Sequence, residues 1–399
     1  MSDTRDNATD GADGILGEDL IGSAHSLLPE IRGMVDEIDD ARQLPDRLVT
    51  RLADAGFFRM LLGRELGGLE ADPLTAAQVV ETLSTVSPSV GWVVMIVAST
   101  NFWTARVLPD EAVTEIFTPG VPINVVGNLV PHGQALRVDG GWRVSGQWPM
   151  GSGCHQADWM ASGGWLHDEQ GPIMDGDVPG WRVFYTPIGD CHILDTWHST
   201  GLRGTGSHDY TMDDVFVPDR MVSQHPLRAP NLRPNRHYTY SAMVVGAMAS
   251  VALGGARGAV DSLIEILGGK QELPSSRPAS TNFDKQGDLG AAEALVGSAR
   301  AYLHDTLAQV WAKITTGEPL SSELRARFRL ACTNAGTASV DAVDRVYRAG
   351  GTESIYVSSP VERLFRDVHT VAAHVAMRPA TLADGGALLL GERPNMPGF

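Results

Sequence analysis

Two histidines stand five residues apart in the stretch VERLFRDVHTVAAHVAM, residues 361–377. The stretch contains no Gly or Pro, so it predicts an unbroken helix. On such a helix His369 and His374 are separated by about 140° around the axis, so they cannot share a metal ion as an i, i+4 pair does. No metal site is predicted. His374 can act alone in acid-base or hydrogen-bonding chemistry, or it can be a histidine at the core edge with a locally satisfied ring nitrogen.

Three polar, glycine-rich stretches interrupt otherwise regular elements: WPMGSGCHQADW (148–159), WHSTGLRGTGSHD (197–209) and YRAGGTESIY (347–356). Glycine lets a backbone approach a ligand closely, and the hydroxyls of Ser152, Thr205, Ser207 and Thr352 supply hydrogen-bonding groups. A tight turn is the alternative interpretation of each stretch. Taken together with the histidine-bearing helix, they indicate one large cofactor. The sequence contains no GxGxxG, Walker, HExxH or GxSxG motif.

The chain has 399 residues and a net charge of −17, which disfavours nucleic acid and anionic membranes as partners. Its first residues, MSDTRDNATDGADG, lack the apolar core of a secretion signal and predict a disordered lead-in. No run approaches 18 apolar residues, so no membrane span is expected. The three cysteines form no CxxC pair and fit a reducing cytoplasm, with Cys154 interpreted as a buried, inert thiol.

The predicted secondary structure changes from helices to strands and back to helices along the chain, which divides it into three units. Apolar positions with a period of 3.6 predict helices in residues 20–42, 45–58, 74–86 and 89–108, and the last of these is apolar nearly all round, so it should be buried. Alternating patterns predict strands in 157–166, 180–188 and 210–218, and a hairpin in 135–146 with its turn at Asp139-Gly140. Long helical patterns return in 241–267, 289–314, 321–350 and 361–377 and predict a four-helix bundle.

The predicted boundaries follow from this order. Residues 1–16 form the lead-in, 17–121 an N-terminal helical domain, 122–225 a central β domain and 226–399 a C-terminal four-helix bundle. The fold class is α+β with mostly α structure.

Two stretches, GLRGTGSHDYTMDDVFVP (201–218) and AGGTESIYVSSPVERLFRDVHTVAAH (349–374), resemble the acyl-CoA dehydrogenase superfamily. The resemblance extends over about residues 20–391 and is greater to the two-component (group D) flavin-dependent monooxygenases. It implies the acyl-CoA dehydrogenase-like fold, with a β-barrel or sandwich between the two helical units.

One position separates the two branches of this superfamily. Dehydrogenases typically continue this helix into Tyr-Glu-Gly-Thr, where the glutamate removes a proton beside a thioester carbonyl. The same register here reads His374-Val375-Ala376-Met377, so the usual base is absent. The resemblance therefore favours the monooxygenase branch, which commonly has a histidine at the first of these positions. A dehydrogenase or oxidase of CoA-bound or carrier-bound acyl chains, using bound FAD, is the alternative. A protein with this flavoprotein fold that binds a ligand or partner without turnover is a third hypothesis.

In the monooxygenase branch a separate NAD(P)H flavin reductase supplies reduced FMN or FAD. The reduced flavin reacts with O₂ to give a C4a-hydroperoxyflavin, which hydroxylates a small or polycyclic aromatic substrate, or an amine. The resemblance also implies a homotetramer, and we expect a cytoplasmic enzyme of secondary metabolism.

The resemblance assigns roles to individual residues. Ser152 matches a serine placed near flavin N5, and His374 matches a catalytic histidine on the substrate side. Arg277 resembles an arginine that meets the flavin phosphate, although a solvated arginine is the alternative. The remaining predicted flavin contacts are Gly153, Arg203, Thr205, Ser207, Gly351 and Thr352, and the predicted substrate contacts are Asn101, Trp148 and His374.

Overall fold

The computed structural model describes residues 17–118, 123–226, 231–272 and 276–394, so the predicted lead-in 1–16 lies outside the described residues. The N-terminal part is helical. Its α-helices are α1 (Gly17–Arg32), α2 (Val35–Ala41), α3 (Asp46–Asp54), α4 (Pro73–Ser84), α5 (Pro88–Val107) and α6 (Asp110–Ile116), with the 3₁₀ segments η1 (Phe57–Arg59) and η2 (Arg64–Leu66) before α4.

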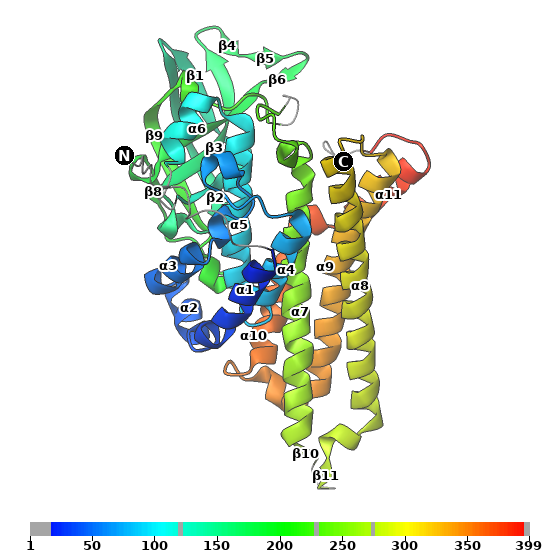
Figure 1. Cartoon of the computed structure of the whole chain (residues 1–399). Coiled ribbons are helices and arrows are strands. Elements are labelled where there is room, and N and C mark those ends of the chain that lie inside the picture. Colours follow the sequence, from blue (N-terminus) through cyan, green and yellow to red (C-terminus); the bar gives the residue numbers. More distant parts are fainter. Residues whose placement is uncertain (1–16, 119–122, 227–230, 273–275, 395–399) are drawn as a thin grey trace, which may run out of the picture.

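Helix α5 is the central element of the N-terminal part (Figure 1). Its start is fixed by Ser87, whose Oγ accepts from the N–H of Val90 at 3.4 Å, and by Pro88 in the first turn. Most of its residues are buried, which confirms the expectation from its nearly uniform apolar pattern. The helix lies between the β domain and the bundle, so its side chains reach both.

The central part is a mixed sheet in the order β4-β3-β1-β2-β9-β8, with β7 also paired to β3. The long strands are β1 (Val125–Val138), β2 (Gly141–Gly151), β3 (Trp159–Asp168), β7 (Trp181–Pro187) and β9 (His208–Pro218). The short ones are β4 (Gly171–Pro172) and β8 (His192–Ile193), whereas β5 (Met174–Asp175) and β6 (Val178–Pro179) pair with each other in a separate two-stranded sheet. Strands β1 and β2 form the predicted hairpin, and Gly140 adopts φ +73° in its turn.

The C-terminal part contains the predicted bundle of α7 (Val244–Gly269), α8 (Phe283–Thr316), α9 (Ser322–Gly350) and α10 (Pro360–Ala372), followed by α11 (Ala380–Leu389). The connection from α7 to α8 carries a small hairpin, β10 (Gln271–Glu272) and β11 (Arg277–Pro278), at one end of the bundle (Figure 1). Glu81 of α4 accepts from Arg300 at 2.5 Å and from His304 at 2.9 Å, both on α8, so the N-terminal helices are tied to the bundle.

The predicted helix 361–377 is interrupted, which corrects the sequence prediction. Helix α10 ends at Ala372, His374 is extended (φ −64°, ψ 140°), and a short turn, η11 (Val375–Met377), follows. The Nδ1 atom of His374 accepts from the N–H of Ala376 at 3.2 Å, and Arg329 of α9 donates to the Ala376 carbonyl at 3.3 Å. These side chains satisfy backbone groups that a continuous helix would have paired internally.

Helix α7 bears on the expectation that no segment crosses a membrane. Residues Ser241–Gly269 reach a mean hydropathy of 1.5, so by length and composition this segment could cross a membrane, but 83% of that window is buried inside the protein. The apolar content instead packs α7 against α4, α9 and α10. A Cβ atom at Gly254 would lie 2.2 Å from the carbonyl oxygen of Glu81, and one at Gly258 would lie 1.9 Å from that of Thr85, so glycine permits this close approach.

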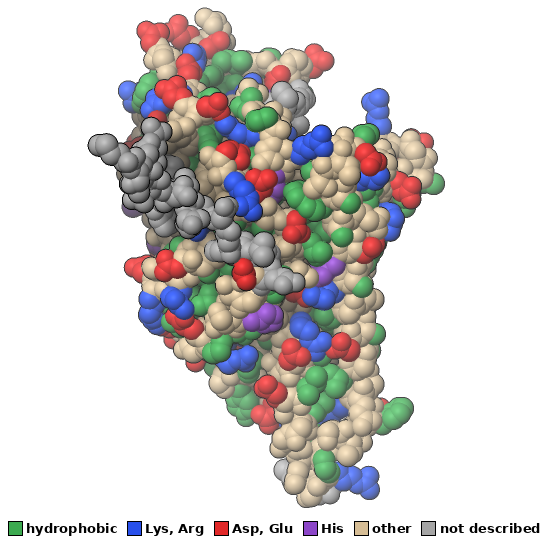
Figure 2. Space-filling model, in the orientation of Figure 1, with side chains coloured by type: hydrophobic (Ala, Val, Ile, Leu, Met, Phe, Trp, Pro, Cys, Tyr) green, Lys and Arg blue, Asp and Glu red, His purple; other side chains and the backbone are tan. Residues whose placement is uncertain are grey.

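The surface shown in Figure 2 carries interspersed acidic and basic side chains, and hydrophobic side chains reach it at several places on the lower bundle.

Candidate active site

Ser152 lies in the turn that ends β2. Met150, two positions before it, has φ +58° and is 59% exposed, and Gly153 directly after it has φ +75°. The N–H of Ser152 donates to the Met150 carbonyl at 3.0 Å, and the N–H of Gly153 donates to the Thr205 carbonyl at 2.8 Å. The two glycine-rich stretches 148–159 and 197–209 are therefore joined, and both contribute to one site.

A row of buried hydroxyls runs through this junction. Trp92 Nε1 of α5 donates to Ser152 Oγ at 3.1 Å, and Ser152 Oγ lies 2.6 Å from Ser207 Oγ. Ser207 Oγ lies 2.6 Å from Thr205 Oγ1, which donates to the Leu202 carbonyl at 2.8 Å. Of the predicted flavin residues, Ser152, Gly153, Thr205 and Ser207 are thus brought together.

The turn that carries Thr205 is fixed by α10. Leu202 has φ +52°, a left-handed conformation that costs a non-glycine residue about 1–2 kcal/mol. Its N–H donates to Asp367 Oδ1 at 2.6 Å, and its carbonyl also accepts from Trp197 Nε1 at 3.0 Å. Asp367 is 1% exposed. Burial, with a smaller contribution from the Asp39 carboxylate, raises the pKa of Asp367 to about 7.

His374 meets the same site through Trp92. The two rings are arranged edge to face with centroids 5.6 Å apart, and the Trp92 N–H is the group that donates to Ser152. One indole therefore contacts both residues that the sequence singled out as catalytic. Trp92 itself was missed, because the apolar pattern of its helix gives no indication of which face meets the Ser152 turn.

The surroundings of His374 determine the protonation state of its ring, and this state limits the role that the residue can have. Burial, together with Arg378 and Arg329, lowers the pKa of His374 to about 4, so the ring is neutral at neutral pH. Because Nδ1 accepts from Ala376, the proton of the neutral ring is on Nε2. His374 therefore offers a hydrogen-bond donor, and not a strong base, to a bound molecule.

Cys154 lies beside this site and matches the prediction of an inert thiol. It is fully buried, its Sγ donates to the Gly206 carbonyl at 3.3 Å, and burial raises its pKa to about 11. No group of three or more His, Cys, Asp or Glu side chains that could hold a metal ion exists among the described residues.

Two predicted substrate residues are placed elsewhere. Trp148 is fully buried inside the β domain, where Nε1 donates to the Gly163 carbonyl at 2.7 Å and the ring stacks on Tyr210. Asn101 is nine residues after Trp92, which on an α-helix is a rotation of about 180° to the opposite face. Its amide donates to the carbonyls of Phe58 and Ile123, each at 3.0 Å, and accepts from the N–H of Val125 at 3.1 Å. Both side chains hold the fold together, and neither substrate contact is supported by this geometry.

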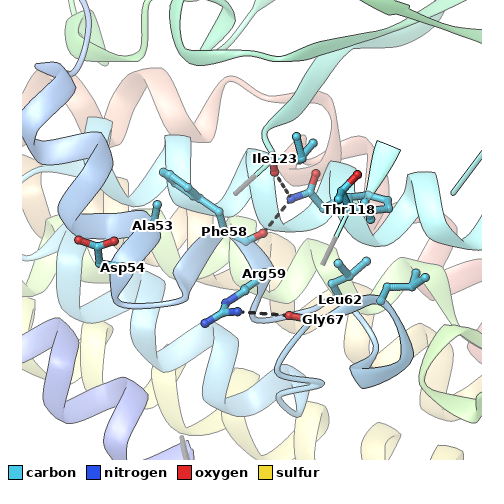
Figure 3. Close-up of a pocket in the computed structure, with 11 residues that line it drawn as sticks. Ala53, Asp54, Phe58, Arg59, Leu62, Gly67, Thr118 and Ile123 are labelled. Carbon is cyan, nitrogen blue, oxygen red and sulfur yellow. Dashed lines mark hydrogen bonds between the residues drawn. The ribbon is translucent and has the colours of Figure 1, made fainter. Parts of the chain in front are cut away.

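A cavity of about 230 Å³ lies on the Asn101 side of α5 (Figure 3). Arg59 crosses its lower edge and donates to the Gly67 carbonyl at 3.4 Å. The lining residues are Ala53, Asp54, Phe58, Arg59, Leu62, Leu66, Gly67, Asn101, Phe117, Thr118 and Ile123. The cavity is separated from Ser152 and His374 by the thickness of the helix.

The other predicted flavin residues are also outside the hydroxyl row. Arg203 donates to the Asp39 carbonyl at 3.2 Å and lines a neighbouring cleft between α2 and α10. Arg277 lies in β11 at the end of the bundle (Figure 1). Gly351 and Thr352 are exposed in η10 (Gly351–Ile355), which is held beside that hairpin by the ion pair of Lys270 with Glu353 at 3.4 Å.

Comparisons with known proteins identify the family. Residues 27–119 match the family model of the acyl-CoA dehydrogenase N-terminal domain, and residues 247–379 match that of the C-terminal domain. The chain is 30% identical over 372 residues to the oxygenase subunit of the flavin-dependent monooxygenase HsaA of Mycobacterium tuberculosis, an alignment covering 91% of this chain and 92% of the relative. The chain belongs to the flavin-dependent monooxygenases of the acyl-CoA dehydrogenase superfamily.

Further relatives agree with this assignment of the chain to the monooxygenases. The chain is 28% identical over 369 residues to an indole-3-acetate monooxygenase of Pseudomonas putida, in an alignment that covers 92% of each chain. Its fold matches XiaF from Streptomyces sp., solved in complex with FADH2 and glycerol, with a TM-score of 0.88, 26% identity and coverage of 96% and 98%. The predicted fold and the flavin monooxygenase function, as opposed to the dehydrogenase alternative, are confirmed.

Proposed function

We propose that this monooxygenase takes a reduced flavin, FMN or FAD, from a separate reductase and uses O₂ to hydroxylate a small or polycyclic aromatic compound, or an amine. The observation that carries the proposal is the meeting of Ser152 and His374 at Trp92. The two residues come from stretches more than 200 positions apart in the sequence. The relatives whose names include an oxygenase subunit support the use of a separate reductase.

The residues present fit a flavin ring. The hydroxyls of Ser152, Ser207 and Thr205 form a polar row at the edge of a largely apolar wall, and Trp92 adds an aromatic surface. Bound reduced flavin would supply the electrons that activate O₂ for transfer to the substrate. Ser152 would hold the ring at N5, and the buried surroundings would exclude water.

His374 would act on the other reactant. Its neutral ring would donate from Nε2 to an oxygen atom at the reacting centre and orient it. Ser99 is a further candidate for substrate contact. It lies seven residues after Trp92, almost on the same helical face, and its Oγ is buried without a hydrogen-bond partner in the described part of the chain.

The presence of valine at position 375 argues against thioester dehydrogenation. It occupies the register of the usual carboxylate base, and its apolar side chain is 48% exposed. A valine cannot remove the proton beside a carbonyl group.

The direct test is rapid mixing of the protein and anaerobically reduced FMN or FAD with oxygenated buffer. A transient absorbance distinct from reduced and oxidised flavin is expected, with a lifetime far longer than that of free flavin in the same buffer. Immediate reoxidation at the rate of free flavin would contradict the proposal. Reduction of bound oxidised flavin by an acyl-CoA without any reductase would establish a dehydrogenase instead.

We also propose a homotetramer that works in the cytoplasm in secondary metabolism. The placement of Arg277, Gly351 and Thr352 at the far end of the bundle supports the assembly, because these residues can reach a flavin near Ser152 only from another copy. The three unpaired cysteines support a reducing compartment.

A further inference from the structure

At each end of the row of hydroxyls, the direction of the hydrogen bond is fixed by the partner group. An indole N–H can only donate, so Trp92 must donate to Ser152 Oγ, at 3.1 Å. A carbonyl oxygen can only accept, so at the other end Thr205 Oγ1 donates to the Leu202 carbonyl, at 2.8 Å. Between these ends lie two contacts of 2.6 Å, from Ser152 to Ser207 and from Ser207 to Thr205.

Each hydroxyl has one proton, so these ends define the direction of the row. If Thr205 donates to Leu202, it must accept from Ser207, and Ser207 must then accept from Ser152. Every hydroxyl proton then has an acceptor inside the protein. In the opposite direction, Thr205 donates to Ser207 and Ser207 to Ser152, which leaves the Ser152 proton without an acceptor in the row. The first direction therefore has one more hydrogen bond.

The carbonyl that ends the row is held in place. Leu202 has φ +52°, and its N–H is bound by the buried Asp367 at 2.6 Å. Trp197 Nε1 also donates to the Leu202 carbonyl at 3.0 Å, which fixes its orientation from a second side. Ser152 is 7% exposed and Ser207 is 3% exposed, so water has little access to replace a missing partner.

We propose that this directed row makes Ser152 a hydrogen-bond acceptor toward the bound flavin and thereby selects the reduced form over the oxidised form. Reduced flavin carries an N–H at N5, which can donate to Ser152. Oxidised flavin has only a lone pair there, and it can bind Ser152 only if the whole row reverses and the Thr205–Leu202 bond is given up. Trp92, Ser207 and Thr205 are then specificity residues for the redox state of the flavin. The inference rests on the proposed placement of N5 against Ser152.

The test is the ratio of dissociation constants for oxidised and reduced FMN, and for FAD, titrated anaerobically by fluorescence. Thr205→Val removes the terminal hydroxyl at nearly constant volume, so the row can reverse without losing a bond. The ratio of the oxidised to the reduced constant should fall roughly 2–10-fold, the range that one net hydrogen bond gives. Ser207→Ala interrupts the row and should lower the ratio by a similar factor.

Two control variants separate this effect from general loosening. Thr205→Ser keeps the hydroxyl and should keep the wild-type ratio. Ser162→Ala removes a buried hydroxyl of the same sheet, which bonds Tyr210 at 2.8 Å outside the row, and should not move the ratio. Equal weakening of both redox states in Thr205→Val and Ser207→Ala would overturn the proposal. A wild-type protein that binds neither form would instead refute the proposed function on which it rests.

Discussion

In the proposed function His374 has two tasks in one ring, and they can be separated. Nδ1 accepts the Ala376 N–H and shapes the break after α10, whereas Nε2 carries the proton that would be donated to a ligand. His374→Asn keeps a side-chain oxygen for the Ala376 N–H but shortens the side chain and removes the Nε2 donor. The variant should unfold at close to the wild-type temperature, yet transfer oxygen about 10²–10⁴-fold more slowly in single-turnover product assays.

His374→Ala should lose both functions and also destabilise the protein by about 1 kcal/mol. A His374→Asn enzyme with unchanged rate and coupling would show that His374 is only the core-edge histidine of the alternative interpretation.

The lowered pKa of His374 predicts a pH profile. A histidine with a folded-state pKa of about 4 is neutral throughout the range above about pH 5, so its titration contributes no change in rate between pH 5.5 and 8. The oxygen-transfer rate, measured by quenched single turnovers, should show no ionisation near 6.5 that depends on this residue. An ionisation near 6.5 that disappears in His374→Asn would contradict the assignment.

Ser152→Ala should produce a different defect from the His374 variants. Without the hydroxyl at N5, reduced flavin still binds, but hydrogen peroxide is released faster and O₂ consumption is uncoupled from product. The measurement is peroxide formed per O₂ consumed, with Ser162→Ala as the buried serine control. Equal coupling in the two serine variants would remove Ser152 from the mechanism.

Asp367 should make stability depend on pH. Its folded pKa of about 7 lies above the usual 3.8, so its contribution is present at acid pH and is lost as the pH rises through 7. Asp367→Asn keeps an acceptor for the Leu202 N–H without a charge beside Asp39, so it should raise the unfolding temperature at pH 8 more than at pH 5. Arg363 and Arg366, which also face this carboxylate, are common to both proteins.

Asp367→Ala is the matched control, because it leaves the buried Leu202 N–H unsatisfied and should cost roughly 1–3 kcal/mol at both pH values. If Asp367→Asn is destabilising at pH 8, then the buried carboxyl group is charged and well paired in the native protein.

At the scale of elements, α7 approaches α4 through glycines. A Cβ at Gly258 would lie 1.9 Å from the backbone oxygen of Thr85, so Gly258→Ala must push the helices apart and should destabilise by about 3 kcal/mol, the upper range for overpacking. Gly268 of the same helix has nothing within 4 Å of its Cβ position, so Gly268→Ala should be neutral or slightly stabilising. Urea unfolding of both variants checks the contrast, and similar stabilities would show that α7 can shift without cost.

Local signals predicted most of these elements. Ser87 and Pro88 indicate the start of α5, and Asp139-Gly140 indicates the β1–β2 turn, because caps and turns depend on neighbouring residues. The break at His374 has no such signal, since it depends on a histidine cap and on Arg329 from another helix. The sequence around Trp148 likewise gives no sign that its indole N–H donates to Gly163 of β3, so this residue was predicted to contact the substrate.

At the scale of the whole molecule, the distribution of predicted flavin contacts predicts assembly. Arg277 lies at the bundle end, whereas Ser152 lies at the β domain (Figure 1). Ile355, Tyr356 and Val357, which follow Thr352, are 58%, 59% and 79% exposed, an apolar surface that a second copy would cover. Light scattering should therefore give a tetramer, and Arg277→Ala should weaken FAD binding.

Arg327→Ala, near the start of α9 at the opposite end of the bundle, serves as the control for general charge loss, because its 3.9 Å ion pair with Asp305 is exposed. A monomer with full flavin affinity would refute the shared-site assembly.

The turn that carries Ser152 also predicts where peroxide should first oxidise the protein. Any peroxide that escapes a failed turnover meets two sulfur atoms close by in the sequence. The thiol of Cys154 is buried and stays protonated, so it reacts poorly, whereas the thioether of Met150 is 59% exposed. Methionine oxidation should thus begin at Met150. The sulfoxide would place a polar side chain at a residue with a strained backbone, two positions from Ser152. Each turnover that releases peroxide would then increase the fraction of later turnovers that are uncoupled from product formation.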